Sequence, residues 1–133
     1  RTMASPPGWH ERTKQRMKAM GFKDVRVRLH PGRHKAERTL DEDLDGASLC
    51  VIWSSSSGVR ALARGIPTVY CAPHWILSSA AGRGLETVFD PPHSDHDRLE
   101  AFQRMAHAQW RVDEIEAGTP FARMLERLED ARW

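Results

Sequence analysis

Residues 49–58 read Leu-Cys-Val-Ile-Trp-Ser-Ser-Ser-Ser-Gly, and the fold class follows from this stretch. The five apolar residues have the length of a strand. A continuous apolar run is typical of a strand buried on both faces, as in a parallel sheet. Four serines and a glycine then lead into a short helical pattern at residues 59–64. The stretch therefore predicts a strand–loop–helix unit of an α/β domain.

The residues before this unit predict a helix, a strand and a second helix. Apolar residues recur at helical spacing over residues 9–20, and residues 25–29 alternate apolar and polar side chains as a half-buried strand does. Thr39 is suited to cap a short helix that ends at Leu44, with Glu42 as its capping-box partner.

The residues after the unit continue the alternation. Residues 68–71 predict a third strand, residues 82–84 a loop, and residues 95–117 a long helix. Helices between strands imply right-handed crossovers, so we expect a Rossmann-like parallel sheet flanked by helices in a single domain. This domain would cover residues 1–118, and a helix at 119–133 would pack back on it or on a partner half.

Size and composition limit the class of protein. The 133 residues suit one domain or half of a larger enzyme, and 40% hydrophobic with 29% charged residues is ordinary for a globular chain. No run approaches the roughly 18 apolar residues of a membrane span, and no signal peptide is recognisable.

Cys50 and Cys71 lie in strand-like runs. We expect both to be reduced core residues of a cytoplasmic protein.

The charge is unevenly spread along the chain. Residues 1–40 carry 11 Lys and Arg against 3 Asp and Glu, a balance of +8, whereas residues 41–133 carry 9 against 15, a balance of -6. A basic first third suits an anionic ligand such as a phosphate, a nucleotide or nucleic acid. The alternative is a solvated basic helix without a ligand.

The serines after the apolar strand are the sharpest candidate for a binding site. Hydroxyls and N–H groups at a strand–helix turn can receive an anion, and one serine would suffice for a helix cap. Four serines therefore favour a phosphate site, with a serine-rich cap as the alternative. The run is neither a P-loop nor a nucleophile elbow. The predicted phosphate-binding serines are Ser54, Ser55, Ser56 and Ser57.

Two further loops leave the carboxyl ends of predicted strands, where parallel sheets bind ligands. His30, which precedes Pro31, could donate to a phosphate oxygen, and Arg28 and Arg33 could add positive charge. An exposed turn histidine is the alternative interpretation. In the loop after residues 68–71, His74 and Trp75 could contact a base or sugar, unless Trp75 plugs the edge of the core.

Together these motifs resemble the C-terminal, nucleotide-sugar-binding half of GT-B glycosyltransferases. The likeness is to bacterial enzymes of the capsular polysaccharide and sialyltransferase type, which have His-Pro and Ser-Ser motifs and use CMP-activated sugars. It rests on Leu-His-Pro at residues 29–31, the serine stretch at 49–58, and Ala-Leu-Ala-Arg-Gly-Ile-Pro-Thr at residues 61–68. It covers about residues 25 to 75.

The resemblance implies that His30 and two of the serines hold the phosphate of a CMP- or UDP-linked sugar, and that no metal or other cofactor is essential. In this family the catalytic base lies in the N-terminal half. Asp45-Gly46 follows the His-Pro motif instead of preceding it, so no catalytic residue is assigned. An acceptor-binding half, absent here, or a second copy of the chain would complete such an enzyme.

Two other classes of function remain open. One is a binding module without chemistry of its own, and the other is a nucleic-acid-associated protein that uses the basic first third. A metal site is a weaker rival, because the candidate ligands lack the paired spacing of zinc motifs. These ligands are His93, Asp95, His96 and Asp97, the pair His30 and His34, and Cys71 with His74.

Overall fold

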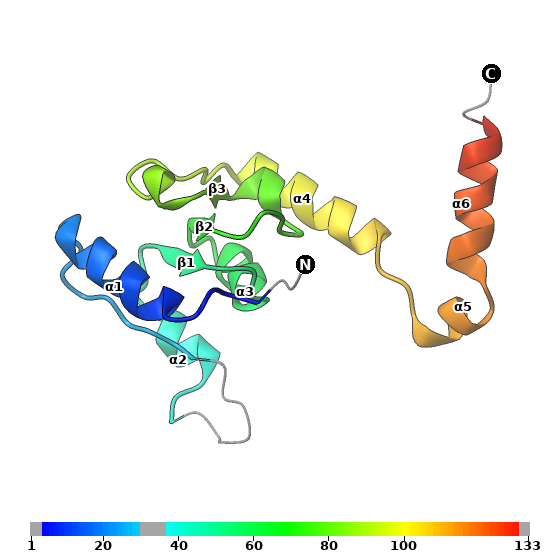
Figure 1. Cartoon of the computed structure of the whole chain (residues 1–133). Coiled ribbons are helices and arrows are strands. Elements are labelled where there is room, and N and C mark those ends of the chain that lie inside the picture. The colour runs from blue at the N-terminus through cyan, green and yellow to red at the C-terminus, as the bar shows by residue number, and fades with distance from the viewer. Residues whose placement is uncertain (1–3, 30–36, 131–133) are drawn as a thin grey trace. The chain divides into compact units, whose positions relative to one another are not determined.

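The computed structural model describes residues 4–29 and 37–130 (Figure 1). The chain forms two compact units, residues 1–101 and residues 102–133. The first unit holds the sheet and the second consists mainly of helices. The single domain that the sequence predicts is therefore not confirmed. Within the described residues, no helix is long and apolar enough to cross a membrane.

The sheet has three parallel strands in the order β1-β2-β3. They are β1 (Cys50–Ile52), β2 (Thr68–Tyr70) and β3 (Gly82–Arg83). Val51 lies opposite Val69, which in turn lies opposite Gly82. Helices flank this sheet, so the α/β class with a parallel sheet is confirmed, and the arrangement is compatible with a Rossmann-like fold.

Helices in the first unit begin where the sequence provides a start signal. Thr39 caps α2, because its Oγ1 accepts from the Glu42 backbone N–H at 3.2 Å while the Glu42 carboxylate accepts from the Thr39 N–H at 2.6 Å. This confirms the predicted capping box. The helices of this unit are α1 (Trp9–Ala19), α2 (Leu40–Leu44) and α3 (Ser57–Ala63), with 3-10 turns η1 (Ser78–Ala80) and η2 (Leu85–Thr87). A further helix, α4 (Asp95–His107), begins in the first unit and ends in the second.

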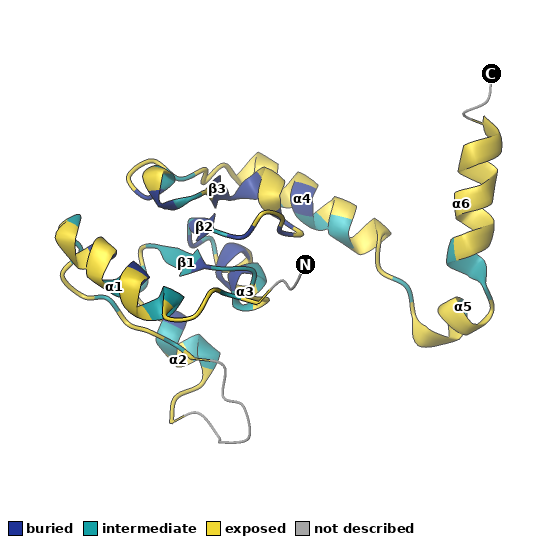
Figure 2. Cartoon of the chain, viewed as in Figure 1, coloured by how far each residue is buried: buried dark blue, intermediate teal, exposed yellow. Residues whose placement is uncertain are grey.

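Hydrophobic packing is centred on β2, in which all three residues are buried (Figure 2). Val69 belongs to a cluster that includes Met17 of α1 and Leu85 of η2. A second cluster joins Leu44 of α2 to residues of α3 and the turn that follows it. Burial of these apolar side chains fixes α1, α2 and α3 around the sheet.

Two predictions about the strands are wrong. Residues 24–29 connect α1 to the next described residues without strand pairing, although their alternating pattern predicts a strand at 25–29. The third strand is instead β3, which lies within the predicted loop at residues 82–84. β3 has only two residues and Gly84 follows it, so it carries no alternating pattern that a sequence could reveal.

The prediction of one long helix over residues 95–117 is also wrong. α4 ends at His107, and a new helix, α5 (Val112–Glu116), begins after Arg111 has adopted an extended conformation. The last helix, α6 (Thr119–Asp130), starts at Thr119 as expected. In residues 102–130 none of the side chains is fully buried, and Arg123 lies 5.0 Å from the Trp110 ring centre.

Candidate ligand-binding site

A cavity of about 770 Å³ in the first unit runs along β1, from the residues that precede this strand to those that follow it. Its walls come from α1, the connecting segment 24–29, α2, β1 and the serine loop, by which we mean residues 54–57. Small-molecule sites usually have volumes of roughly 300–1,000 Å³. One part of its lining, the serine loop, follows the carboxyl end of β1, where parallel sheets generally bind ligands.

Hydrogen bonds within the serine loop shape it. Ser55 Oγ accepts from the backbone N–H of Ser57 at 3.2 Å and from the Ser57 hydroxyl at 2.8 Å. The next two N–H groups, those of Gly58 and Val59, donate to the backbone oxygens of Ser55 and Ser56. These three backbone donors are therefore already paired within the chain.

The four serines differ in how open they are. Ser55 and Ser56 are exposed, whereas Ser54 and Ser57 are half-buried. The Ser56 side chain makes no capping bond to α3. All four line the cavity. Ser55 and Ser56 are therefore the members best placed to meet an incoming group.

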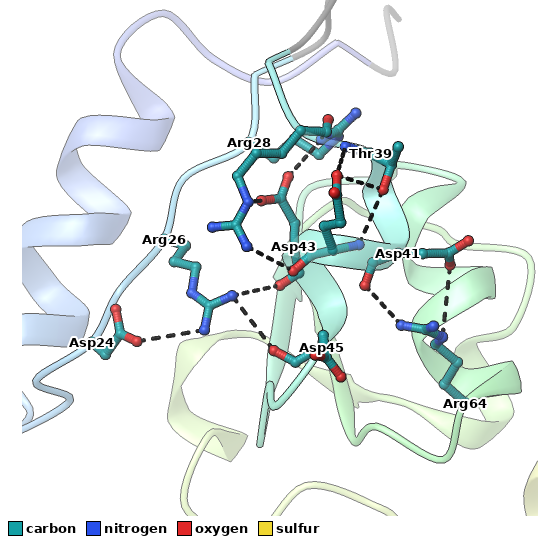
Figure 3. Close-up of polar contacts among 10 residues, drawn as sticks. Asp24, Arg26, Arg28, Thr39, Asp41, Asp43, Asp45 and Arg64 are labelled. Carbon is teal, nitrogen blue, oxygen red and sulfur yellow. Dashed lines mark hydrogen bonds and ion pairs between the residues drawn. The ribbon is translucent and has the colours of Figure 1, made fainter.

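Arg28 also lines the cavity, but its charge is paired (Figure 3). One guanidinium nitrogen, Nη1, lies 2.5 Å from Asp43 Oδ2 and donates to the backbone oxygen of Arg38 at 2.8 Å. Arg26 reaches the backbone oxygens of Asp43 and Asp45 at 3.4 and 3.5 Å. These contacts fasten the segment 24–29 to α2, so an anion would have to compete with Asp43 for Arg28.

The remaining predicted site residues do not gather at this cavity. His30 and Arg33 lie outside the described residues. His74 is exposed, and neither it nor Trp75 is among the cavity-lining residues. Trp75 is 7% exposed and stacks on Tyr70 with ring centres 5.9 Å apart. This burial matches the alternative interpretation, in which Trp75 fills the edge of the core.

Residues of α1 contribute a wall that the sequence did not predict. Trp9, His10 and Lys14 all line the cavity, and Trp9 meets Trp53 edge-on with ring centres 5.8 Å apart. Lys14 forms no ion pair within the described ranges 4–29 and 37–130. The only sequence signal was the spacing of His10 and Lys14, which places them one helical turn apart beside the apolar stripe of α1.

One polar atom of a cavity-lining residue outside α1 has no hydrogen-bond partner among the described residues. The indole nitrogen of Trp53, Nε1, is buried and has no hydrogen-bond partner among the described residues. A buried N–H without an acceptor is energetically unfavourable, and such a group needs an explanation.

The cysteines are not suited to nucleophilic chemistry. Burial raises the pKa of Cys50 from the ordinary 9.0 to about 11. Burial, and then the nearby charge of Glu86, also raises the pKa of Cys71 to about 11. Since the thiolate is the reactive form, both thiols are unreactive near neutral pH.

Neither metal ligands nor relatives give a further indication of function. Among the described residues, no three His, Cys, Asp or Glu side chains gather in a way that could hold a metal ion. No protein-family model matches the chain, and no curated protein and no solved structure is significantly similar to it.

Proposed function

We propose that the first unit binds the nucleotide phosphate of an activated sugar, as the donor-binding half of a glycosyltransferase. The observation that carries this proposal is that the serine loop, Arg28 and Lys14 of α1 line one cavity alongside β1. Hydroxyl donors and cations in a hollow with apolar walls suit a ligand that is part anion and part ring.

The charges around the cavity support an anionic ligand. Lys14 supplies a cation with no ion-pair partner in the described part of the chain, and Arg28, partly neutralised by Asp43, lines the same cavity. The serine hydroxyls can donate to phosphate oxygens, and hydrogen bonds to charged groups are stronger than neutral ones. CMP- and UDP-linked sugars present such a phosphate.

The chemical role of this site would be to stabilise the departing phosphate as the glycosidic bond breaks. Prearranged donors and cations lower the energy of charge that develops in a transition state. Ser55, Ser56 and Lys14 would carry this role, with His30 as a further donor. We assign no catalytic base, and the acceptor would bind to a partner half or a second copy of the chain.

A calorimetric titration of the full chain with CMP, UDP, UMP and GDP tests the proposal. We expect saturable binding of at least one nucleotide and a loss of about tenfold or more when Ser55 and Ser56 are both changed to alanine. The change Ser79→Ala is the matched control, because Ser79 is an exposed serine outside the cavity lining.

Two outcomes would overturn the proposal. One is that none of the four nucleotides binds. The other is binding of DNA or RNA that weakens steeply with salt and is unaffected by the serine changes, which would favour the nucleic-acid alternative. Nucleotide binding without sugar transfer, even with an acceptor half supplied, would favour the non-catalytic binding module.

A further inference from the structure

We propose that Trp9 and Trp53 form a subsite for the nucleobase of the bound ligand. This inference rests on the proposed nucleotide site and adds to it the part of the ligand that the serine loop does not hold. Neither tryptophan has a role in the phosphate chemistry described above. Both line the same cavity as the serine loop.

The two rings provide an aromatic wall that a planar group can contact. Their centres are 5.8 Å apart and their planes meet at 70°, so the edge of one ring points at the face of the other. Both side chains are only half-buried. Aromatic side chains that line a binding site are common stacking platforms for nucleobases.

The unpaired Nε1–H of Trp53 indicates what kind of ring fits. This donor is buried and finds no acceptor among the described residues. A ligand that brings a carbonyl oxygen to Nε1 would satisfy it, whereas a hydrocarbon ring would leave it unpaired. The carbonyl group of a pyrimidine base supplies both the planar face and the acceptor.

One side chain must move for this contact to form. Nε1 of Trp53 is closed to solvent, so a ligand reaches it only after a neighbouring group shifts. Trp9 touches Trp53 and lies in the first turn of α1, where it contacts His10 with ring centres 5.4 Å apart. Trp9, which packs on Trp53, is the side chain that we propose moves to let a base reach Nε1.

The position of Trp53 connects the two parts of the ligand. Trp53 directly precedes the serine loop in the chain. A base that contacts its ring would therefore be close to the hydroxyls proposed to hold the phosphate. Lys14 lies one turn after His10 on α1, within the same cavity wall. Ring and anion would therefore bind side by side.

The test compares UMP and CMP with ribose 5-phosphate, which has the phosphate and the sugar but no base. We expect the wild-type chain to prefer a pyrimidine nucleotide over ribose 5-phosphate by about tenfold or more. Trp53→Phe, which keeps a ring but removes the N–H, should reduce that preference about 2- to 10-fold. Trp9→Leu should remove most of the preference for a pyrimidine nucleotide over ribose 5-phosphate. Neither change should alter the affinity for ribose 5-phosphate.

Controls separate this inference from the proposed phosphate site. Trp110→Phe, in the second unit, should leave the preference unchanged, and Trp9→Phe replaces Trp9→Leu if the latter melts early. Equal binding of nucleotide and ribose 5-phosphate by the wild type, or an undiminished preference in both tryptophan variants, overturns the nucleobase subsite and leaves the phosphate site standing. Failure of every ligand to bind overturns both.

Discussion

Gly58 sets the distance between the serine loop and the sheet. A β-carbon at this position would lie 2.5 Å from Ile52 Cδ1 and 2.8 Å from Trp75 Cζ2, closer than side chains approach one another. The absence of a side chain thus lets α3 start directly against β1 and the buried Trp75. The serine hydroxyls are positioned for the cavity because this backbone can come so near.

Gly58→Ala should lower the free energy of unfolding by about 1–3 kcal/mol, because the new methyl group forces Ile52 and Trp75 to move in a packed region. Chemical denaturation monitored by circular dichroism measures the change. Ser56→Ala, at an exposed neighbour without a capping bond, should stay within about 0.5 kcal/mol of the wild type. Equal stability of the glycine and alanine forms would contradict the tight packing described here.

The two cysteines make stability depend on pH in the alkaline range. Their folded-state pKa values are raised by burial from 9.0 to about 11, so the folded chain keeps protons that the unfolded chain releases. The contribution of the two thiols to the free energy of unfolding should therefore be constant below pH 9 and fall as the pH rises toward 11. Thermal melts of the wild type and of Cys50→Ala across this range measure how steeply the stability of each protein falls with pH. We expect a shallower fall in Cys50→Ala, and an equal or steeper fall would contradict the assignment.

The pairing of Arg28 with Asp43 predicts a change in anion affinity. Asp43→Asn removes the carboxylate that lies 2.5 Å from Arg28 and releases its charge toward the cavity. The affinity for the nucleotide that binds should rise a few-fold, as calorimetry would show. Asp45→Asn is the control, because Asp45 contacts Arg26 through its backbone oxygen. An unchanged or lower affinity would show that Arg28 does not reach the ligand.

At the scale of elements, the capping box of α2 holds one wall of the cavity in place. Thr39→Ala removes the hydroxyl that accepts from the Glu42 N–H and should cost about 1 kcal/mol of stability. The hydrogen bonds with Thr39 hold the pKa of Glu42 below its ordinary value of 4.5. The stability that the ionised Glu42 carboxylate adds is therefore complete above pH 4.5 and is lost as the pH falls through the lowered pKa. Urea denaturation at pH 7 and at lower pH checks both statements.

Glu37→Ala is the control for this capping prediction, because Glu37 is exposed and lies just before the cap. If Thr39→Ala and Glu37→Ala were equally stable at pH 7, the capping box would not hold α2. If Thr39→Ala lost the same amount of stability relative to the wild type at every pH down to 3, the role assigned to the ionised Glu42 carboxylate would be contradicted.

Local signals in the sequence predicted most elements of the first unit. The apolar runs predicted β1 and β2, and Thr39 with Glu42 predicted α2, because these patterns depend on nearby residues. The prediction failed at residues 24–29, where Arg26 and Arg28 attach the chain to α2 through side chains. It also failed at Gln109–Arg111, where nothing in the apolar spacing marks the break between α4 and α5.

The candidate site was predictable only in part. The serine loop could be proposed as a site because four hydroxyls follow an apolar run of strand length, although in the structure β1 is only partly buried. The burial of Trp75 and the placement of Trp9 beside Trp53 depend on contacts between residues far apart in the chain. The partner of Arg28 likewise comes from another element. Such long-range contacts leave no spacing pattern in one sequence.

For the whole molecule, the sheet and the cavity belong to the first unit. Residues 102–130 of the second unit have no buried side chain, and the apolar side chains along α6 are exposed (Figure 2). The basic first forty residues include α1 and the segment 24–29, which form cavity walls. The charged residues that line the cavity are Lys14, Arg26 and Arg28 on one side of the balance and Asp24 and Asp43 on the other, which leaves a small positive excess at the site proposed to bind an anion.

The most direct test of the central claim is a nuclear magnetic resonance titration of the full, nitrogen-labelled chain with CMP and UMP. We predict saturable shifts of the backbone amides of residues 54–57 and of the indole N–H signals of Trp9 and Trp53, while Ser78 and Ser79 stay unchanged. Shifts confined to residues outside the cavity, or no shifts at millimolar nucleotide, would contradict the account.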